Sequence, residues 1–241
     1  VGSDMVAVYE RRAGVLLPEA CVGALLTQAV QRGADIRLGE AVVSWSATSD
    51  GVAVQTSHDA FTAGSLVLAA GGWLPELTGD AHFGLWVERQ VMYWFDAVPY
   101  GAHSSQSPIT LWQLETGRML YTTPDFGDGC KVAFHHDGEA ATMADVRRSV
   151  GDAEVREMEE TVATCIPGLT PTVRRSATCV YTNTANHDFL IDRYPDHSNV
   201  VIASACSGHG FKFGPAVAEL VAQLVTDDKQ QTPARFATRQ S

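Results

Sequence analysis

A glycine turn near the C-terminal end has the clearest chemical meaning in this sequence. Residues 207–210, Ser-Gly-His-Gly, follow the β-branched run 200–203, which predicts a buried strand. Apolar residues at helical spacing come next, and these predict a helix: Val217, Leu220, Val221 and Leu224. A turn between a strand and a helix presents unpaired backbone N–H groups and a partial positive charge. It therefore suits a phosphate or a group that gains negative charge during a reaction.

Lys212 lies in the first turn of the expected helix, where the helix dipole disfavours a cation. We therefore expect it to bind something, the alternative being a solvated lysine beside a packing glycine. The spacing of Gly208, Gly210 and Gly214 misses the dinucleotide pattern G-x-G-x-x-G by one residue, and that pattern occurs nowhere in the chain. A polar tail follows the helix in place of the second strand that a dinucleotide fold requires.

Lys131 and His135 form a second candidate pair. They are four residues apart in a predicted strand, so both side chains point to the same face. The alternatives are an exposed strand lysine and a core histidine. His136 and Asp137 are adjacent, and neighbours on a strand point to opposite faces, so we predict no metal site here.

The elements that must position these residues alternate between helix and strand. An amphipathic helix is predicted from Pro18 to Gly33, and one or two helices over residues 142–165. A hairpin turn is predicted at residues 115–118. The predicted strands are residues 36–38, 41–45, 52–55, 66–70, 91–95, 109–114, 119–122, 131–135, 179–181, 190–191 and 200–203.

This order predicts a mixed α/β fold in which a discontinuous α/β domain surrounds an inserted, mainly antiparallel β-sheet domain. We place the first α/β segment at residues 1–83 and the inserted sheet with helices at 84–175. The returning α/β segment is placed at 176–228, and a polar tail at 229–241.

Three motifs together resemble the C-terminal part of the monomeric sarcosine oxidase and N-methyltryptophan oxidase family of flavoenzymes. They are Cys-Val-Tyr-Thr at 179–182, His-Asp-Phe-Leu-Ile-Asp at 187–192 and Ser-Gly-His-Gly-Phe-Lys-Phe at 207–213. Weaker similarity extends upstream to residues 14–16. The chain looks like the last three-fifths of such an oxidase, without the N-terminal G-x-G-x-x-G unit that binds the ADP half of FAD.

The resemblance implies roles for several residues. Cys179 would be joined covalently to the flavin, the alternative being a buried strand cysteine. Lys131 would stabilise the charge that forms when O2 accepts an electron, and His135 would lie by the substrate amine. The flavin would also contact Gly71, Gly72, Trp73, Gly208, His209, Gly210, Phe211 and Lys212.

The substrate pocket is expected at Tyr121, Tyr181 and Lys212, with Lys212 holding the substrate carboxylate. Trp112 departs from the family pattern, because it stands where sarcosine oxidase has a smaller pocket residue. This departure indicates that the substrate differs from sarcosine.

Composition excludes several other classes. The chain has 241 residues, 45% of them hydrophobic, which is enough for a substantial core, and no apolar run approaches the length of a membrane span. A net charge of −11 without basic clusters argues against nucleic acid or an anionic membrane as a partner. Five cysteines without short repeated spacings fit a reducing cytoplasm.

The sequence thus predicts FAD-dependent oxidation of a secondary or N-methylated amino acid, with hydride transfer to flavin, imine hydrolysis and reduction of O2 to hydrogen peroxide. One alternative is a related amine dehydrogenase or fructosyl-amino-acid-type oxidase. Another is a fragment without activity or bound FAD by itself, whose exposed surface a homodimer or an N-terminal segment would cover. A hydrolase built on Ser207 and His209 is disfavoured, since no G-x-S-x-G motif occurs.

Overall fold

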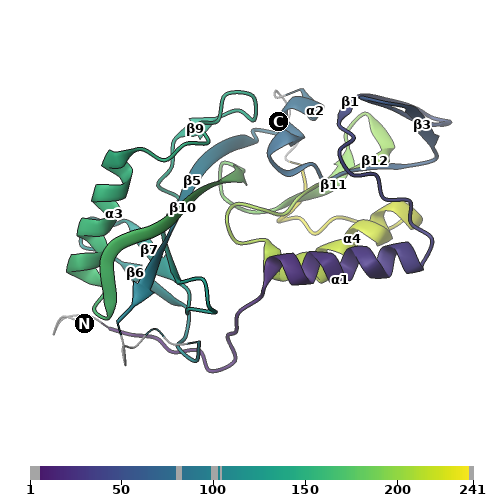
Figure 1. The fold of residues 1–241 in the computed structure, drawn as a ribbon. Coiled ribbons are helices and arrows are strands. Elements are labelled where there is room, and N and C mark those ends of the chain that lie inside the picture. The colour runs from purple at the N-terminus through teal and green to yellow at the C-terminus, as the bar shows by residue number, and fades with distance from the viewer. Residues whose placement is uncertain (1–5, 80–82, 99–102, 104, 239–241) are drawn as a thin grey trace. The chain divides into compact units, whose positions relative to one another are not determined.

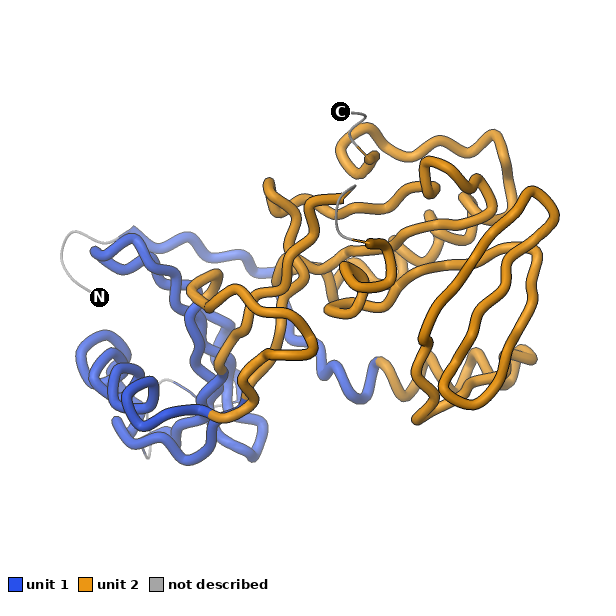
Figure 2. Tube along the Cα trace, turned by 90° about the horizontal axis from the view of Figure 1, so that it is seen from above, with its two compact units in different colours: residues 1–21, 92–134, 150–177 blue, residues 22–91, 135–149, 178–241 orange. Residues whose placement is uncertain are grey.

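The computed structural model describes residues 6–79, 83–98, 103 and 105–238. These residues form two compact units, which Figure 2 colours separately. Unit 1 comprises residues 1–21, 92–134 and 150–177, and unit 2 comprises residues 22–91, 135–149 and 178–241. The predicted mixture of helices and sheets is confirmed, whereas the exact domain boundaries proposed from the sequence stay a prediction.

The elements are labelled in Figure 1. The helical segments are α1 (Pro18–Gln31), η1 (Gly71–Trp73), α2 (Leu74–Thr78), α3 (Asp152–Cys165), η2 (Phe211–Phe213) and α4 (Gly214–Thr226). The first strands are β1 (Val42–Thr48), β2 (Gly51–Thr56), β3 (Ala60–Ala63), β4 (Leu66–Leu68), β5 (Trp86–Ala97) and β6 (Thr110–Gln113). The remaining strands are β7 (Met119–Thr122), β8 (Cys130–His135), β9 (Ala140–Ala141), β10 (Leu169–Asn183), β11 (Leu190–Tyr194) and β12 (His197–Ser204).

The core of unit 2 is a sheet in the order β11-β12-β4, in which β12 runs parallel to β4 and antiparallel to β11. Val200 and Ile202 of β12 belong to one apolar cluster with Leu68, and the alternate residue Val201 belongs to another with Leu224 of α4. Both faces of β12 are therefore covered. This confirms the buried strand predicted from the β-branched run at 200–203.

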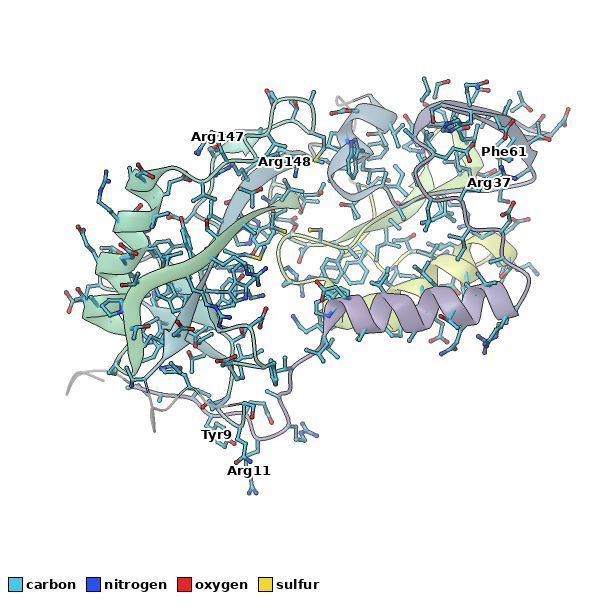
Figure 3. The ribbon with its side chains drawn as sticks, in the orientation of Figure 1. Tyr9, Arg11, Arg37, Phe61, Arg147 and Arg148 are labelled. Atoms are coloured by element: carbon cyan, nitrogen blue, oxygen red, sulfur yellow. The ribbon has the colours of Figure 1, made fainter. Side chains whose placement is uncertain are left out.

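A small antiparallel sheet, β1-β2-β3, also lies in unit 2. Figure 3 labels Phe61 of β3 and Arg37, and the Arg37 guanidinium lies 4.8 Å from the centre of the Phe61 ring. The expected strand at residues 36–38 is absent, and Arg37 in this segment pairs with Asp35 and Asp59. Strand β3 is an element that the sequence did not predict.

Unit 1 contains the hairpin of β6 and β7, which pair antiparallel with Trp112 opposite Leu120. The predicted turn is confirmed by a hydrogen bond of 2.9 Å from Leu114 N–H to the Arg118 carbonyl. The wider sheet has the order β10-β5-β8-β7-β6, with β9 also pairing with β5. Strands β5, β8 and β10 each begin in one unit and end in the other.

The helices differ from expectation at two places. Residues 142–165 contain only α3, which begins after Gly151, whose N–H donates to the Glu154 carboxylate at 2.8 Å. Residues 142–145 instead form a turn in which Asp145 accepts a hydrogen bond from Thr142 N–H. α1 forms where the amphipathic helix was predicted, but it buries none of its residues, so its apolar side is exposed, with Leu25 57% exposed. None of the described helices combines the length and apolar character that crossing a bilayer requires.

Candidate functional site

The glycine turn at 207–210 leaves the end of β12 and leads into η2 and α4, as the sequence predicted. Its position is fixed by β10, since Ser207 N–H donates to the Thr182 carbonyl at 3.0 Å and Thr182 N–H points to the Cys206 sulfur at 3.4 Å. A bond of 3.0 Å from His209 N–H to the Cys206 carbonyl closes the turn. The turn is therefore a fixed part of unit 2.

The two central glycines of this turn are required for different reasons. A Cβ at Gly210 would lie 1.5 Å from the Ala205 carbonyl oxygen, so this glycine permits the turn to pack on its own backbone. Gly208 has φ +71°, and a Cβ there would lie 2.5 Å from the Tyr181 ring and 2.8 Å from the His135 ring. Gly208 thus allows the turn to touch both of these candidate residues.

His135 and Tyr181 lie next to each other in unit 2. His135 Nδ1 is 3.3 Å from the Tyr181 hydroxyl oxygen. Burial lowers the pKa of His135, and repulsion from His136, His209 and His187 in their protonated forms lowers it further, against the opposing effect of Glu88. The His135 imidazole is therefore neutral at pH 7 and can accept a proton.

His209 lies in the turn, and Lys212 lies in η2 directly after it. Lys212 Nζ donates to the His209 carbonyl at 2.9 Å, so its ammonium group is directed back over the turn. His209 is itself held by a contact of 3.0 Å between Nε2 and the His187 carbonyl and by stacking on Phe189. The turn thus carries a cation at the N-terminal end of η2 and α4. The expected bond from Lys212 to a substrate carboxylate stays a prediction.

The second glycine segment, at η1, has one open position. Gly71 has φ +54°, and nothing lies within 4 Å of the place where its Cβ would be. A Cβ at Gly72 would clash with the Met143 sulfur at 2.5 Å, so Gly72 is needed for internal packing. Trp73 is 55% exposed. Gly71 and Trp73 are therefore accessible, whereas Gly72 is not.

The cysteines differ in environment, and none of the five forms a disulfide. Burial, followed by the charge of Asp125, raises the pKa of Cys130 to about 12, and its thiol donates to the Thr123 carbonyl at 2.8 Å. Cys130 is therefore an unreactive core thiol. Cys179 is partly buried on β10, with its sulfur 3.7 Å from the Val180 carbonyl oxygen. In the described part of the chain, no three His, Cys, Asp or Glu side chains are arranged to hold a metal ion.

Three further candidate residues lie in unit 1. Lys131 is opposite Trp94 on β5, and its ammonium group is 5.6 Å from the centre of the Tyr121 ring. Tyr121 pairs with Leu111, whereas Trp112 pairs with Leu120, so the two aromatic side chains point to opposite faces of the hairpin. The structure thus brings Lys131 to Tyr121 and does not bring Trp112 to either.

The sequence interpretation gave no role to several residues of the unit 2 site. Glu88 and Asn183 are buried, and they bond to each other at 2.7 Å. His136, considered only as a metal ligand, contacts Glu88, and the His187 ring contacts the His136 ring. One signal was available, because Glu88, Arg89 and Gln90 follow one another directly before the apolar and aromatic residues 91–95.

Replacing His135 should weaken the pH dependence of folding stability. A folded-state pKa below the ordinary value means that the unfolded chain binds more protons, so stability falls as the pH falls through about 6.5. His135→Asn removes this effect, which amounts at most to about 1.4 kcal/mol per pH unit. Urea unfolding between pH 7.5 and 5 measures it. His58→Asn, at an exposed histidine outside the site, is the control, and an equal loss of slope in both variants would contradict the assignment.

Comparison with known proteins identifies the family. The FAD dependent oxidoreductase family matches residues 3–224. A monomeric sarcosine oxidase of Streptomyces avermitilis is 40% identical over 230 residues, covering 92% of this chain and 59% of that protein. An N-methyl-L-tryptophan oxidase of Escherichia coli O139:H28 is 27% identical over 244 residues, covering 98% of this chain and 64% of that protein.

Solved structures agree at the level of the fold. NikD, an unusual amino acid oxidase essential for nikkomycin biosynthesis, matches with a TM-score of 0.76 at 20% identity, over 92% of this chain and 60% of that chain. The chain therefore spans about three-fifths of the length of these proteins. The resemblance inferred from the motifs at 179–182, 187–192 and 207–213 is confirmed. This chain belongs to the FAD dependent oxidoreductase family.

Proposed function

We propose that a protein containing this chain oxidises a secondary or N-methylated amino acid with FAD as the cofactor. The observation that carries the proposal is the contact of the turn at Gly208 with both His135 and Tyr181, in a chain of this family. When bound, FAD would supply the hydride-accepting chemistry for the carbon beside the amine nitrogen; water would hydrolyse the imine, and O2 would receive the two electrons to give hydrogen peroxide.

The residues of unit 2 fit a flavin. A flavin gains negative charge when it is reduced, and the turn offers backbone N–H groups at a helix start with the Lys212 ammonium beside them. Gly71 has open space where a side chain would otherwise stand. We assign flavin contact to Gly71, Trp73, Gly208, His209, Phe211 and Lys212, and we assign Gly72 and Gly210 an indirect role through the backbone packing that they permit.

His135 and Tyr181 prepare the amine for reaction. A protonated amine has no lone pair to support loss of a hydride, so a base must hold its proton. The lowered pKa of His135 keeps the imidazole neutral and able to do so. The Tyr181 hydroxyl, 3.3 Å from Nδ1, orients the ring and lines the substrate cavity. Lys212 binds the substrate carboxylate in this proposal, and this requires it to exchange its bond to the His209 carbonyl for one to the substrate.

In this proposal Lys131 acts in the reaction of the reduced flavin with O2, and Tyr121 lines the substrate pocket. A fixed ammonium group stabilises the negative charge that develops when O2 accepts an electron. The assignment of Trp112 to the substrate pocket rests on the resemblance alone, because its side chain lies on the opposite face of the hairpin from Tyr121.

The ADP half of FAD requires a G-x-G-x-x-G unit, which we expect from a preceding segment or a separate chain. We place the reaction in the cytoplasm, because the five cysteines are odd in number and lack the short repeated spacings of a disulfide scaffold.

The proposed activity predicts peroxide from an N-methylated amino acid. The chain joined to an N-terminal G-x-G-x-x-G unit should bind FAD, and under air it should form one peroxide for each amine oxidised. Coupled peroxide and oxygen-electrode assays measure this ratio. Reduction of the flavin by substrate without reoxidation by O2 would instead establish a dehydrogenase. The 241-residue chain alone is the control, and it should bind FAD weakly.

Flavin in the holoenzyme should be attached at Cys179. The expectation rests on the motif at 179–182 and on a thiol that is neither disulfide-bonded nor fully buried. Acid precipitation should leave the yellow colour with the protein, and Cys179→Ser should release it. Cys165→Ser, at another partly buried cysteine, should keep the colour. Release of the colour from the unmutated protein would defeat the assignment.

Lys131→Met should slow reoxidation of the reduced flavin by roughly a hundredfold or more, the size typical of losing one preorganised charge. Reduction of the flavin by substrate under anaerobic conditions should change much less, because the charge forms only on oxygen. Stopped-flow absorbance separates the two half-reactions. Lys229→Met, in the polar tail, is the matched control. Equal losses in both half-reactions would count against this role for Lys131.

A further inference from the structure

Glu88 places a buried carboxylate in the part of β5 that belongs to unit 2, with its side chain only 3% exposed. Three donors compensate for its burial. Gly138 N–H donates to Oε1 at 2.9 Å, and Asn183 Nδ2 donates to Oε2 at 2.7 Å. His136 Nδ1 lies 3.2 Å from Oε2. A buried charge is tolerated only with partners of this kind, so these contacts hold one another in place.

His136 differs from the other donors because both of its ring nitrogens face oxygen acceptors. Nδ1 faces the Glu88 carboxylate, and Nε2 lies 3.1 Å from the Ser207 carbonyl oxygen. A backbone carbonyl and an ionised carboxylate can only accept hydrogen bonds. A neutral imidazole carries one N–H and could satisfy only one of them. Only the doubly protonated ring donates to both at once.

The surroundings of His136 restrict which ring carries the charge. Its ring centre is 4.2 Å from that of His135, 4.3 Å from that of His187 and 5.3 Å from that of Tyr181. Glu88, on β5, is its acidic neighbour. Two adjacent imidazolium rings would repel each other, and His135 has the lowered pKa. The charge therefore belongs on His136, next to the carboxylate.

The backbone is also strained at the residues around His136. Among the described residues other than glycine, positive φ angles occur at His136 (54°), His187 (59°) and Ser207 (43°). His136 bonds to the Ser207 carbonyl, and its ring contacts that of His187. Such conformations persist only where surrounding contacts hold them, and they concentrate at functional sites. The bonds of His136 join two of the three strained positions directly.

We propose that His136 is a positioning residue, an imidazolium that bridges the Glu88 carboxylate and the Ser207 carbonyl and so fixes the glycine turn against His135 and Tyr181. Loss of the second ring proton breaks one of the two bonds and frees the turn. The consequence for catalysis rests on the proposed function, since it assumes that the turn faces the flavin. The bridge itself does not depend on that assumption.

The protonation state of His136 tests the proposal directly. Long-range proton–nitrogen NMR spectra of the 15N-labelled chain at pH 7 report both ring nitrogens, and His136→Asn identifies the signal. Asn tolerates a positive φ, so the backbone conformation is retained. We expect both His136 nitrogens to have the shifts of a protonated ring. A neutral tautomer in the unmutated chain would overturn the proposal, whatever happens to any variant.

Glu88→Gln should return His136 to a neutral ring. Glu40→Gln is the matched control, since Glu40 is also largely buried, with its side chain 10% exposed, and it bonds to Thr56 outside the site. An unchanged His136 signal in a folded Glu88→Gln chain would contradict the proposal. If that variant unfolds, the spectrum of the unmutated chain still decides the question.

Hydrogen exchange then tests the positioning role. In His136→Asn, the His209 amide, which donates within the turn to Cys206, should exchange about tenfold faster, as expected for loss of one charge-assisted bond. The Gly117 amide in the β6–β7 hairpin should be unchanged. Unchanged protection at His209 would overturn the positioning role. A neutral His136 in a working oxidase would refute the bridge alone, and a protonated His136 in an inactive protein would refute only the proposed function.

Discussion

The buried carboxylate of Glu88 is the constraint on which the unit 2 site depends. A buried carboxylate is unfavourable unless donors surround it, and here the donors come from two segments: His136 and Gly138 lie in the connection between β8 and β9, and Asn183 ends strand β10. Gly138 shows how tightly they converge, because a Cβ there would lie 1.7 Å from the Arg89 carbonyl oxygen. One charge thus sets the relative positions of the segments that carry the candidate residues.

The glycine turn is held from several directions. Thr182 of β10 binds its start, His136 binds the Ser207 carbonyl, and the His187 carbonyl contacts the His209 ring. Gly210 lets the turn fold on itself, whereas Gly208 lets it approach His135 and Tyr181. The turn is therefore preorganised by unit 2 alone, which suits a reaction in which charge must be stabilised without delay for rearrangement.

Much of the fold could be predicted because strand patterns here reflect burial directly. The run at 200–203 is apolar on both faces because β12 is covered by α4 on one side and by a second cluster on the other. Prediction failed where local bonds replaced periodicity, as in the Thr142–Asp145 turn and around Arg37. The amphipathic pattern of α1 predicted the helix but not whether its apolar side is buried, since a pattern states what could be buried and not what is present to cover it.

The sequence by itself determined the family, the glycine turn and the residues with chemical potential, because each is a short local pattern of residue types. Tertiary structure decided which of them meet. It separated Trp112 from Tyr121 through the pairing register, and it joined Glu88 to His136 and Asn183, which are 48 and 95 residues away along the chain. Contacts of that kind follow from strand register and from the need to pair a buried charge. Neither can be predicted from the spacing of residues that are close together in the sequence.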